Sequence, residues 1–458
     1  MTKICFLGAD FIGTATACAI ALRCPDIDVS VMEDNVETVA QLNLDKIPMV
    51  DSTIEEAIKT CRNKNLFFSS SSKSEVKQAD VIFVCTSSPL KNPPDEKNPH
   101  FIFLEKAARF IASSSDTSKI VVERSASQMK MADALRTILN ANKSPDVNLV
   151  VVSNPPFIFE GCSMQDMLEP HHVVIGGDDT PEGKEAVDVI FNIYSNWVPK
   201  SRIMRTDITS AELTRIATSA FIAQKVTSIN SFMELCEVTN ADISEIVNII
   251  SRDSRIGYSF LNPYLGFSGS AFHRDVSHLV ELSKSLNLPE VASYWQKIIE
   301  MNEYQRKRLI QRVLKCFFNS LADKKIAIFG LFHGKYPSSV LESPTYYICN
   351  MLLEEFATVA ICDKSENNEK IKYDIKSMCS SKPDNIERVV VTDNPYLAAE
   401  GTQGIVVCSD LDLFKSLDYK RIHKGMIKPA CIFDILKSLS HHRLKEIGFN
   451  VHSIGKHG

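Results

Sequence analysis

The sequence predicts an α/β protein in which two doubly wound parallel-sheet domains are joined by a central helical domain. Three observations support this prediction. Short apolar runs alternate with helical patterns at the start of the chain, a long stretch without Gly or Pro begins at Thr209, and the alternation starts again at Lys324. Because strands that alternate with helices imply a parallel sheet covered on both faces, we expect three domains: 1–208, 209–322 and 323–458.

The first domain opens with a β-α-β unit. Lys3–Leu7 is a short apolar run that stops at Gly8, Thr14–Leu22 is alanine-rich and helical in pattern, and Val29–Met32 is a second apolar run. These lengths and compositions are typical of buried strands on either side of a helix. Further strands are predicted at 66–69, 81–85, 120–123 and 149–153.

The middle domain is predicted from helical periodicity. Apolar residues recur at three-to-four spacing over 209–238, and similar patterns continue to about Asn319. The third domain is not an obvious sequence repeat of the first, although it also begins with a lysine, an apolar strand and a glycine at 324–330. A helix is expected near 345–356, and strands are expected at 359–363, 389–392, 404–409 and 431–434.

Composition argues against several classes of protein. The chain has 458 residues, of which 44% are apolar and 23% are charged, and its net charge of -5 is small. No long basic run is present, so we expect no nucleic-acid partner. No apolar run approaches the ~20 residues of a membrane helix, so we expect no membrane span. The 13 cysteines show no metal-ligand spacing, which favours a reduced, cytoplasmic protein without a metal site.

A Rossmann-like dinucleotide loop is predicted after the first strand. The segment reads Gly-Ala-Asp-Phe-Ile-Gly, which keeps the first and third glycines of the G-x-G-x-x-G pattern. In that pattern the glycines allow a tight turn, and the helix N-terminus supplies N–H donors to a pyrophosphate. Glu33, at the end of the second strand, is placed to bind an adenosine ribose and favours NAD over NADP. The candidate cofactor-binding positions in the loop are Gly8, Asp10, Phe11, Ile12 and Gly13.

Asp10 replaces the middle glycine of this pattern. Its side chain stands where the backbone would meet the pyrophosphate, and at ~4 Å and an effective dielectric of ~20 two like unit charges repel by ~4 kcal/mol. The alternative is that Gly8 and Gly13 only shape a β-α turn and that Asp10 is a solvated helix cap. Both interpretations stay open on the sequence alone.

Phrases along the whole chain resemble the UDP-glucose/GDP-mannose dehydrogenase family. They include SNPPFIFEG, RIGYSFL, GFSGSAFHRD and LPEVASYWQ, and they occur in the order of the family. The resemblance implies an oxidation of a UDP-sugar alcohol, such as that of UDP-glucose, to the acid with two NAD. It also implies an N-terminal NAD-binding domain, a central domain that makes dimers and a C-terminal UDP-sugar-binding domain.

The family's nucleophile is missing at its motif position. The resemblance implies that the aldehyde is trapped on a cysteine in G-F-G-G-S-C-F-x-K-D, and the matching residue here is Ala271. Alanine provides neither a nucleophile nor a thiol leaving group. Ser270 is adjacent but has no evident activating base, and Cys162 and Cys236 do not lie at a motif position. Asp275 matches the family's general base.

Other catalytic positions differ as well. The resemblance places Pro156 where the family has a glutamate that handles water and protons, and Arg215 where it has the lysine that polarises the reacting oxygen. Arginine keeps the charge but is essentially never a proton donor. Ser219 replaces an asparagine, whereas Glu160 matches a family glutamate. By the same resemblance the candidate cofactor contacts are Ser125 and Arg274, and the candidate substrate contacts are Phe157, Arg255, Phe260, Leu261, Phe272 and Lys335.

Three hypotheses follow. In the first, the chain is a pseudoenzyme that binds a UDP-sugar or acts through assembly, as a homo-oligomer or as a hetero-oligomer with an active relative. In the second, it is an altered NAD-dependent oxidoreductase that performs one hydride transfer or uses another sugar. In the third, it is a structural protein with no ligand left. The fold-bearing phrases are intact while the chemistry-bearing positions have changed, and this contrast favours the first hypothesis.

Overall fold

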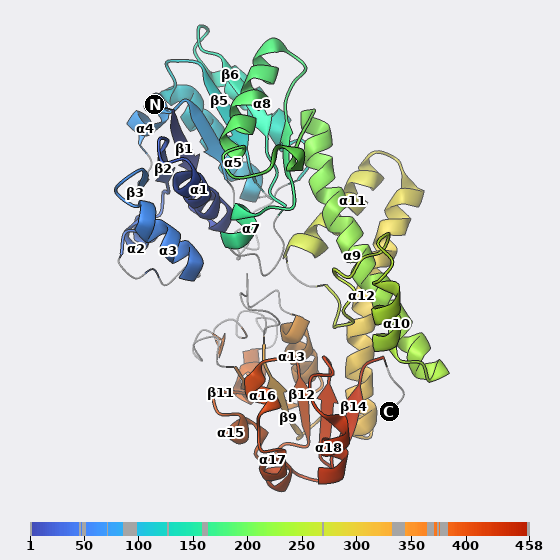
Figure 1. Ribbon diagram of the computed structural model, residues 1–458. Coiled ribbons are helices and arrows are strands. Elements are labelled where there is room, and N and C mark those ends of the chain that lie inside the picture. The colour runs from blue at the N-terminus through green and yellow to red at the C-terminus, as the bar shows by residue number, and fades with distance from the viewer. Residues whose placement is uncertain are drawn as a thin grey trace. The chain divides into compact units, whose positions relative to one another are not determined.

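The computed structural model describes residues 2–44, 47, 52–70, 72–85, 99–125, 128–157, 164–267, 270–331, 344–363, 371, 372, 375 and 383–455. These residues form two compact units, 1–218 and 219–458. Each unit contains one β-sheet with helices on both of its faces (Figure 1). The predicted α/β class, with a helical segment between two sheet domains in the sequence, is therefore confirmed.

The sheet of the first unit has the strand order β3-β2-β1-β4-β5-β6-β7-β8. All neighbouring strands are parallel except β6 and β7, which pair antiparallel at Ser153 and Gly176. The order reverses between β1 and β4, and such a switch point is where open α/β sheets bind ligands. The strands are β1 (Lys3–Leu7), β2 (Asp28–Met32), β3 (Leu66–Ser69), β4 (Val81–Val84), β5 (Lys119–Glu123), β6 (Leu149–Ser153), β7 (Val173–Gly176) and β8 (Ile203–Thr206).

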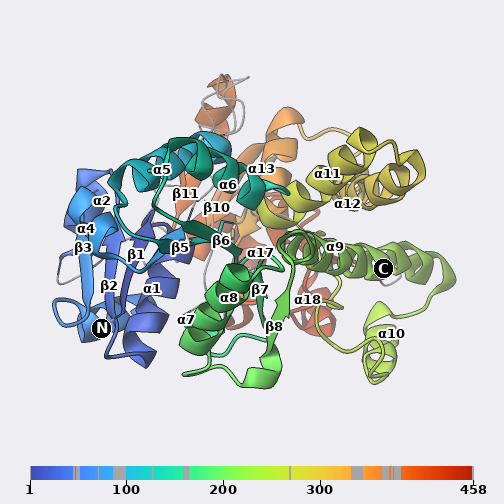
Figure 2. The same cartoon turned by 90° about the horizontal axis from the view of Figure 1, so that it is seen from above.

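Helices cover both faces of this sheet. Figure 2 shows α5 and α6 on one face and α1, α7 and α8 on the other, in agreement with two separate apolar clusters on either side of the strands. The helices are α1 (Phe11–Arg23), α2 (Val36–Leu42), α3 (Ser52–Cys61), α4 (Lys73–Gln78), α5 (Pro99–Ser114), α6 (Met131–Asn142), α7 (Met164–Leu168) and α8 (Pro181–Tyr194), with a 3₁₀ turn at Lys200–Arg202.

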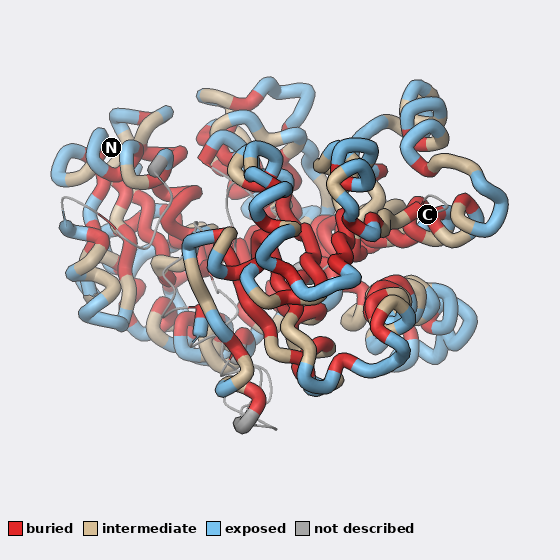
Figure 3. The backbone as a smooth tube through the Cα atoms, turned by 90° about the horizontal axis from the view of Figure 1, so that it is seen from below, coloured by how far each residue is buried: buried red, intermediate tan, exposed pale blue. Residues whose placement is uncertain are grey.

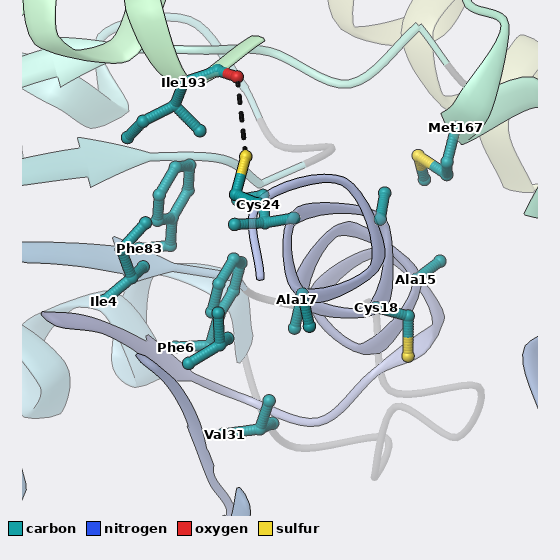
Figure 4. Packing of buried hydrophobic residues seen from close by; sticks show 14 of the residues in the cluster. Ile4, Phe6, Ala15, Ala17, Cys18, Cys24, Val31, Phe83, Met167 and Ile193 are labelled. Carbon is teal, nitrogen blue, oxygen red and sulfur yellow. Dashed lines mark hydrogen bonds between the residues drawn. The ribbon is translucent and has the colours of Figure 1, made fainter. Parts of the chain in front are cut away.

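Strand β1 shows why these short apolar runs become central strands. Side chains alternate along a strand, so Ile4 and Phe6 contribute to the core on the α1 face while Cys5 and Leu7 contribute to the core on the α5 face. Phe6 stacks on Phe83 of β4 with ring centroids 4.6 Å apart (Figure 4). Burying each such side chain stabilises the fold by about 1.5–3 kcal/mol.

The second unit combines long helices with a six-stranded parallel sheet of order β11-β10-β9-β12-β13-β14. Helix α9 (Ile208–Thr239) begins in the first unit and ends in the second. The other helices described in the second unit are α10 (Ile243–Ile250), α11 (Ser270–Ser285), α12 (Pro289–Cys316), α13 (Pro344–Glu354), α15 (Pro395–Ala399), α16 (Asp412–Lys415), α17 (Tyr419–Gly425) and α18 (His441–Ile447). The strands are β9 (Lys325–Phe329), β10 (Thr358–Cys362), β11 (Val389–Thr392), β12 (Gly404–Val407), β13 (Cys431–Asp434) and β14 (Asn450–Ser453), and a 3₁₀ turn spans Pro383–Arg388.

The two sheets share a hydrogen-bond pattern at the end of their first strands. After β1, the N–H of Ala9 donates to the Glu33 carboxylate at 3.1 Å, and after β9 the N–H of Leu331 donates to the Asp363 carboxylate at 2.6 Å. In both units the preceding glycine has a positive φ, 101° at Gly8 and 84° at Gly330. The acid at the end of the second strand therefore fastens the loop after the first strand in both units.

The predicted strands all form, and the structure adds three that the sequence did not suggest, β7, β8 and β14. Buried residues are concentrated in the strands and exposed residues on the outer helices and loops (Figure 3). The described cysteines are free and, apart from Cys316, buried. Among the helices described, none has the length and apolar character that crossing a bilayer requires.

Candidate functional site

The loop that follows β1 enters the switch point of the first sheet. Gly8 adopts a φ of 101°, and a Cβ at this position would collide with the carbonyl oxygen of Cys85 at the end of β4. Only glycine adopts this conformation without strain, and only glycine leaves room for the neighbouring backbone. Its N–H donates to the carbonyl of Met32 at 2.9 Å, so the turn is held against β2.

Asp10 is the N-cap of α1. Its Oδ1 accepts a hydrogen bond from the N–H of Gly13 at 2.7 Å, which is the usual role of an aspartate at this position. A Cβ at Gly13 would lie 3.0 Å from that oxygen and would collide with the carbonyl of Gly8, so the glycine permits this close approach. The carboxylate of Asp10 therefore lies at the helix N-terminus, where an anion is stabilised.

The predicted cofactor residues of the first unit are brought together around this carboxylate. Glu33 accepts from the N–H of Ala9 and, through its other oxygen, from the N–H of Asn35 at 3.1 Å. Phe11 is 39% exposed and Ile12 is half-buried. Burial raises the pKa of Asp10 to about 6; the Gly13 N–H opposes this rise, the charge of Glu33 adds to it, and the Arg124 guanidinium opposes it.

Arg124 is a buried cation at the end of β5 that the sequence reasoning missed. Its Nε donates to Thr16 Oγ1 at 2.9 Å, and its Nη1 donates to the Oδ1 and the carbonyl oxygen of Asn154 at 2.7 and 3.0 Å. These partners are uncharged, and none of the described carboxylates forms an ion pair with Arg124. One feature of the sequence could have indicated it: Arg124 directly follows the strand predicted at 120–123. In the structure Cys85 occupies the same place after the neighbouring strand β4.

A buried acidic residue, Glu123, lies at the end of the same strand and was also missed. Its Oε1 accepts from the N–H of Ser125 at 2.9 Å. Burial raises the pKa of Glu123 to about 7; the Ser125 hydrogen bond opposes this rise, the charge of Glu212 adds to it, and Arg215 opposes it. Glu212 itself accepts from the N–H groups of Lys130 and Ala132 at the start of α6. Arg215, predicted to replace a catalytic lysine, is thus buried in a cluster with two carboxylates.

The segment after β6 carries two further predicted residues. Pro156 is buried, and Phe157 places its ring 4.3 Å from that of His172. Ser153 and Asn154, which precede them, are fully buried. Glu160, which was predicted to match a family glutamate, lies outside the described residues, as does Lys335.

In the second unit, predicted residues meet at the start of α11. Phe272 is buried, with ring centroids 6.3 Å from Phe267 and 6.4 Å from Phe260. Phe260 has a φ of 61°, which is uncommon for a bulky residue and typical of functional loops. Ala271 is the second residue of α11, and Asp275, one turn later, is 2% exposed.

The remaining predicted residues of this unit lie on α9, on α11 and in the segment between α10 and α11. Ser219 is buried on α9, and Leu261 packs in an apolar cluster with Cys236. Arg255 is largely exposed and forms an ion pair with Asp253 at 2.6 Å. Arg274 is half-buried on α11. Among the residues that the structure describes, no group of three metal-ligating side chains occurs.

Comparisons with known proteins cover nearly the whole chain. Three models of the UDP-glucose/GDP-mannose dehydrogenase family match it in order: the NAD-binding domain at residues 2–198, the central domain at 209–304 and the UDP-binding domain at 327–441. The UDP-glucose 6-dehydrogenase of Drosophila melanogaster is 41% identical over 99% of this chain and 96% of its own length. That of Bos taurus is also 41% identical, over 99% and 93%.

Solved structures show a similar fold. A UDP-glucose dehydrogenase from Pyrobaculum islandicum superimposes with a TM-score of 0.83 at 20% identity and covers 100% of this chain and 98% of its own. A UDP-D-ManNAc dehydrogenase from Pyrococcus horikoshii gives a TM-score of 0.76 at 19% identity over 99% of both chains.

Proposed function

We propose, from the premise that this chain belongs to the UDP-glucose/GDP-mannose dehydrogenase family, that it is a pseudoenzyme of that family. It carries the family's NAD-binding and UDP-binding domains but lacks the side chains that oxidise a UDP-sugar to the acid. Its proposed role is to bind a UDP-sugar such as UDP-glucose and to assemble with copies of itself or with an active relative in the cytoplasm. The division into domains at 1–208, 209–322 and 323–458 is part of this proposal.

The observation that carries the proposal is Ala271. It stands at the second position of α11, four residues before the buried Asp275, where the family resemblance implies the nucleophilic cysteine. The sequence holds no cysteine between Cys236 and Cys316 that could replace it. Cys236 is buried in an apolar cluster on α9 and α10, and this burial raises its pKa, which disfavours a thiolate.

The changes on the other unit point the same way. Pro156 is buried shortly after β6, and its side chain has no group that donates or accepts a proton. The charge of Arg215 acts on Glu123 and partly offsets that carboxylate, and a guanidinium does not release a proton at neutral pH. Catalytic groups that act as a unit depend on one another, and losing one member removes most of the rate enhancement. The remaining groups therefore do not replace the nucleophile that is missing at Ala271.

Assembly is supported by an exposed stripe on α9. Positions 221, 225, 228, 232, 235 and 239 are spaced three and four residues apart and therefore share one face of the helix, on which all but the half-buried Lys225 are exposed. Phe221 is 64% exposed, Phe232 47% and Leu235 56%. Large side chains exposed in a row along one helix are typical of a surface that another helix covers.

The test is a direct assay of the purified chain with UDP-glucose and NAD, with the Drosophila relative in parallel as the positive control. We expect no NADH formation above the blank, and no covalent sugar adduct in the mass spectrum of the intact protein. Turnover of ~1 per second, within the ordinary range for enzymes, would overturn the proposal. UDP and UDP-glucose are expected to raise the melting temperature, because a ligand that binds only the folded state stabilises it.

A second candidate, an oxidoreductase that stops after one hydride transfer, is favoured by Glu123. Its pKa of about 7 is suited to accepting a proton near neutral pH, and it is buried near a permanent cation, Arg215. Under this alternative, UDP-glucose and NAD yield NADH and an aldehyde that a carbonyl reagent traps, and replacing Glu123 with glutamine abolishes the signal. Absence of NADH in the wild-type chain at millimolar NAD excludes it.

A further inference from the structure

The N-terminus of α1 keeps two hydrogen-bond donors available for a ligand. The first N–H groups of a helix have no partner within the helix, and here the N–H of Gly13 is taken by Asp10. The N–H groups of Phe11 and Ile12 donate to no acceptor among the described residues. They lie beside the switch point of the sheet, in the domain that matches the family's NAD-binding model. Both donors are therefore positioned to bind a phosphate.

The same place already holds an anion. The Asp10 carboxylate is fixed by the 2.7 Å hydrogen bond to Gly13, one residue beyond the two open donors. Any diphosphate that reached Phe11 and Ile12 would stand next to this carboxylate, in a partly buried loop where charges are poorly screened. With Asp10 ionised, the loop does not fit a diphosphate.

Arg124 provides an independent indication that an anion belongs here. It is 6% exposed and has only uncharged hydrogen-bond partners among the described residues. A buried guanidinium without an ion pair is costly unless a negative charge lies nearby. Its charge acts on both Asp10 and Cys85, which places it near the ends of β1 and β4.

We propose that Asp10 is an internal occupant of the diphosphate position, so that this domain admits a dinucleotide only when the Asp10 carboxylate is neutralised. The loop is then a gated dinucleotide site that is closed by its own side chain at neutral pH. This inference rests on the family's dinucleotide domain and is independent of whether the chain catalyses any reaction.

The groups around Asp10 set the pH at which the site opens. Glu33 faces it from the end of β2, Cys85 from β4 and Arg124 from β5, while the first turn of α1 carries no other charge. Burial holds the pKa of Asp10 at about 6, so the carboxyl is ionised at pH 7.5 and mostly protonated at pH 5.5. A dinucleotide is therefore expected to bind more tightly as the pH falls through about 6.

The experiment measures binding by calorimetry to the full chain, with NAD⁺, ADP-ribose and adenosine as probes, at pH 7.5 and 5.5. Two variants separate charge from structure. Asp10→Asn keeps a cap oxygen for the Gly13 N–H but removes the charge, and Asp10→Gly restores the glycine pattern. Asp418→Asn is the matched control, because Asp418 also caps a helix, α17, in the other unit. Melting temperatures verify that each variant folds.

At pH 7.5, Asp10→Asn and Asp10→Gly are expected to bind NAD⁺ and ADP-ribose at least about tenfold more tightly than the wild type and Asp418→Asn. The wild type is expected to gain a similar factor at pH 5.5, and Asp10→Asn is not. Adenosine, which has no phosphate, is expected to bind all four proteins alike. Affinities within twofold of the wild type for both Asp10 variants, or equal gains with adenosine, would overturn the proposal. Neither result bears on the missing nucleophile.

Discussion

Replacing Glu123 with glutamine tests whether a buried, partly neutralised carboxyl lies at the end of β5. Glutamine has the same shape and keeps an oxygen to accept the N–H of Ser125, which is 2.9 Å from Glu123 Oε1. The substitution removes the ability to ionise and replaces the second carboxylate oxygen with an NH2 donor. Because Glu123 is 2% exposed, its ionisation inside the folded protein is costly.

The magnitude follows from the pKa. A rise from 4.5 to about 7 corresponds to about 3 kcal/mol between the two protonation states, at ~1.36 kcal/mol per pKa unit. Since the folded-state pKa is raised, the stabilisation is fully present below pH 4.5 and is lost as the pH rises through about 7. Between pH 8 and pH 5.5 the wild type therefore gains about 2 kcal/mol of unfolding free energy from this residue, and the variant gains none.

Equilibrium urea unfolding at pH 8 and pH 5.5 measures the effect as the difference between variant and wild type. The quantity compared is the unfolding free energy of Glu123→Gln minus that of the wild type. We expect this difference to be about 2 kcal/mol more favourable to the variant at pH 8 than at pH 5.5. Glu56→Gln, an exposed site on α3 of the same unit, serves as the matched control and should follow the wild-type profile. If Glu123→Gln and Glu56→Gln show the same pH dependence, Glu123 is not a raised-pKa carboxyl and the reasoning fails.

Three further outcomes are expected. Gly8→Ala should lower the unfolding free energy by ~2–4 kcal/mol in urea titration, because of its φ of 101° and the collision with the backbone of β4, whereas Gly425→Ala, where a Cβ meets nothing within 4 Å, should not. Leu235→Asp should reduce the particle mass in light scattering, because it places a charge in the proposed contact between α9 and another subunit. Leu397→Asp, equally exposed on α15, should leave the mass unchanged, and equal masses for the two variants would contradict the assembly surface. Glu237→Gln should destabilise the second unit by about 3 kcal/mol in chemical denaturation, since it leaves two partly buried arginines of α12 without their shared carboxylate; a loss below 1 kcal/mol would show that water already screens them.

The sequence predicted the central strands well because their apolar runs have one cause, burial of the strand on both faces of the sheet. Runs such as Lys3–Leu7 and 120–123 hold three or four consecutive apolar residues beside one charged residue, and a strand buried on both faces requires such a composition in few residues. Two of the three strands that were missed lie outside this rule. β8 exposes Met204 and Arg205, and β14 reads NVHS, so neither carries the apolar run of a central strand. β7 is an apolar run of four residues, the same length as the strands predicted at 66–69 and 389–392, and nothing in its composition explains why it was missed.

The site was harder to predict, because its chemistry depends on burial. Asp10 was recognised as a departure from the glycine pattern, but its two interpretations, a repelling charge and a helix cap, were kept apart. The structure joins them, because the carboxylate that caps α1 is the charge that a phosphate would meet. Glu123 and Arg124 were missed, because no local pattern distinguishes a charged residue that is buried after a strand from one that is solvated there.

The paired acids Glu33 and Asp363 bear on how the two kinds of nucleotide domain are distinguished. Each holds the backbone of its own domain's first loop, one in the sheet that matches an NAD-binding model and one in the sheet that matches a UDP-binding model. In this chain an acid at this position therefore holds the loop of the β-α-β unit by a hydrogen bond that needs no bound nucleotide. Because the sheet that matches the NAD-binding model and the sheet that matches the UDP-binding model both have this hydrogen bond, the contact between acid and loop does not by itself distinguish the two kinds of nucleotide domain.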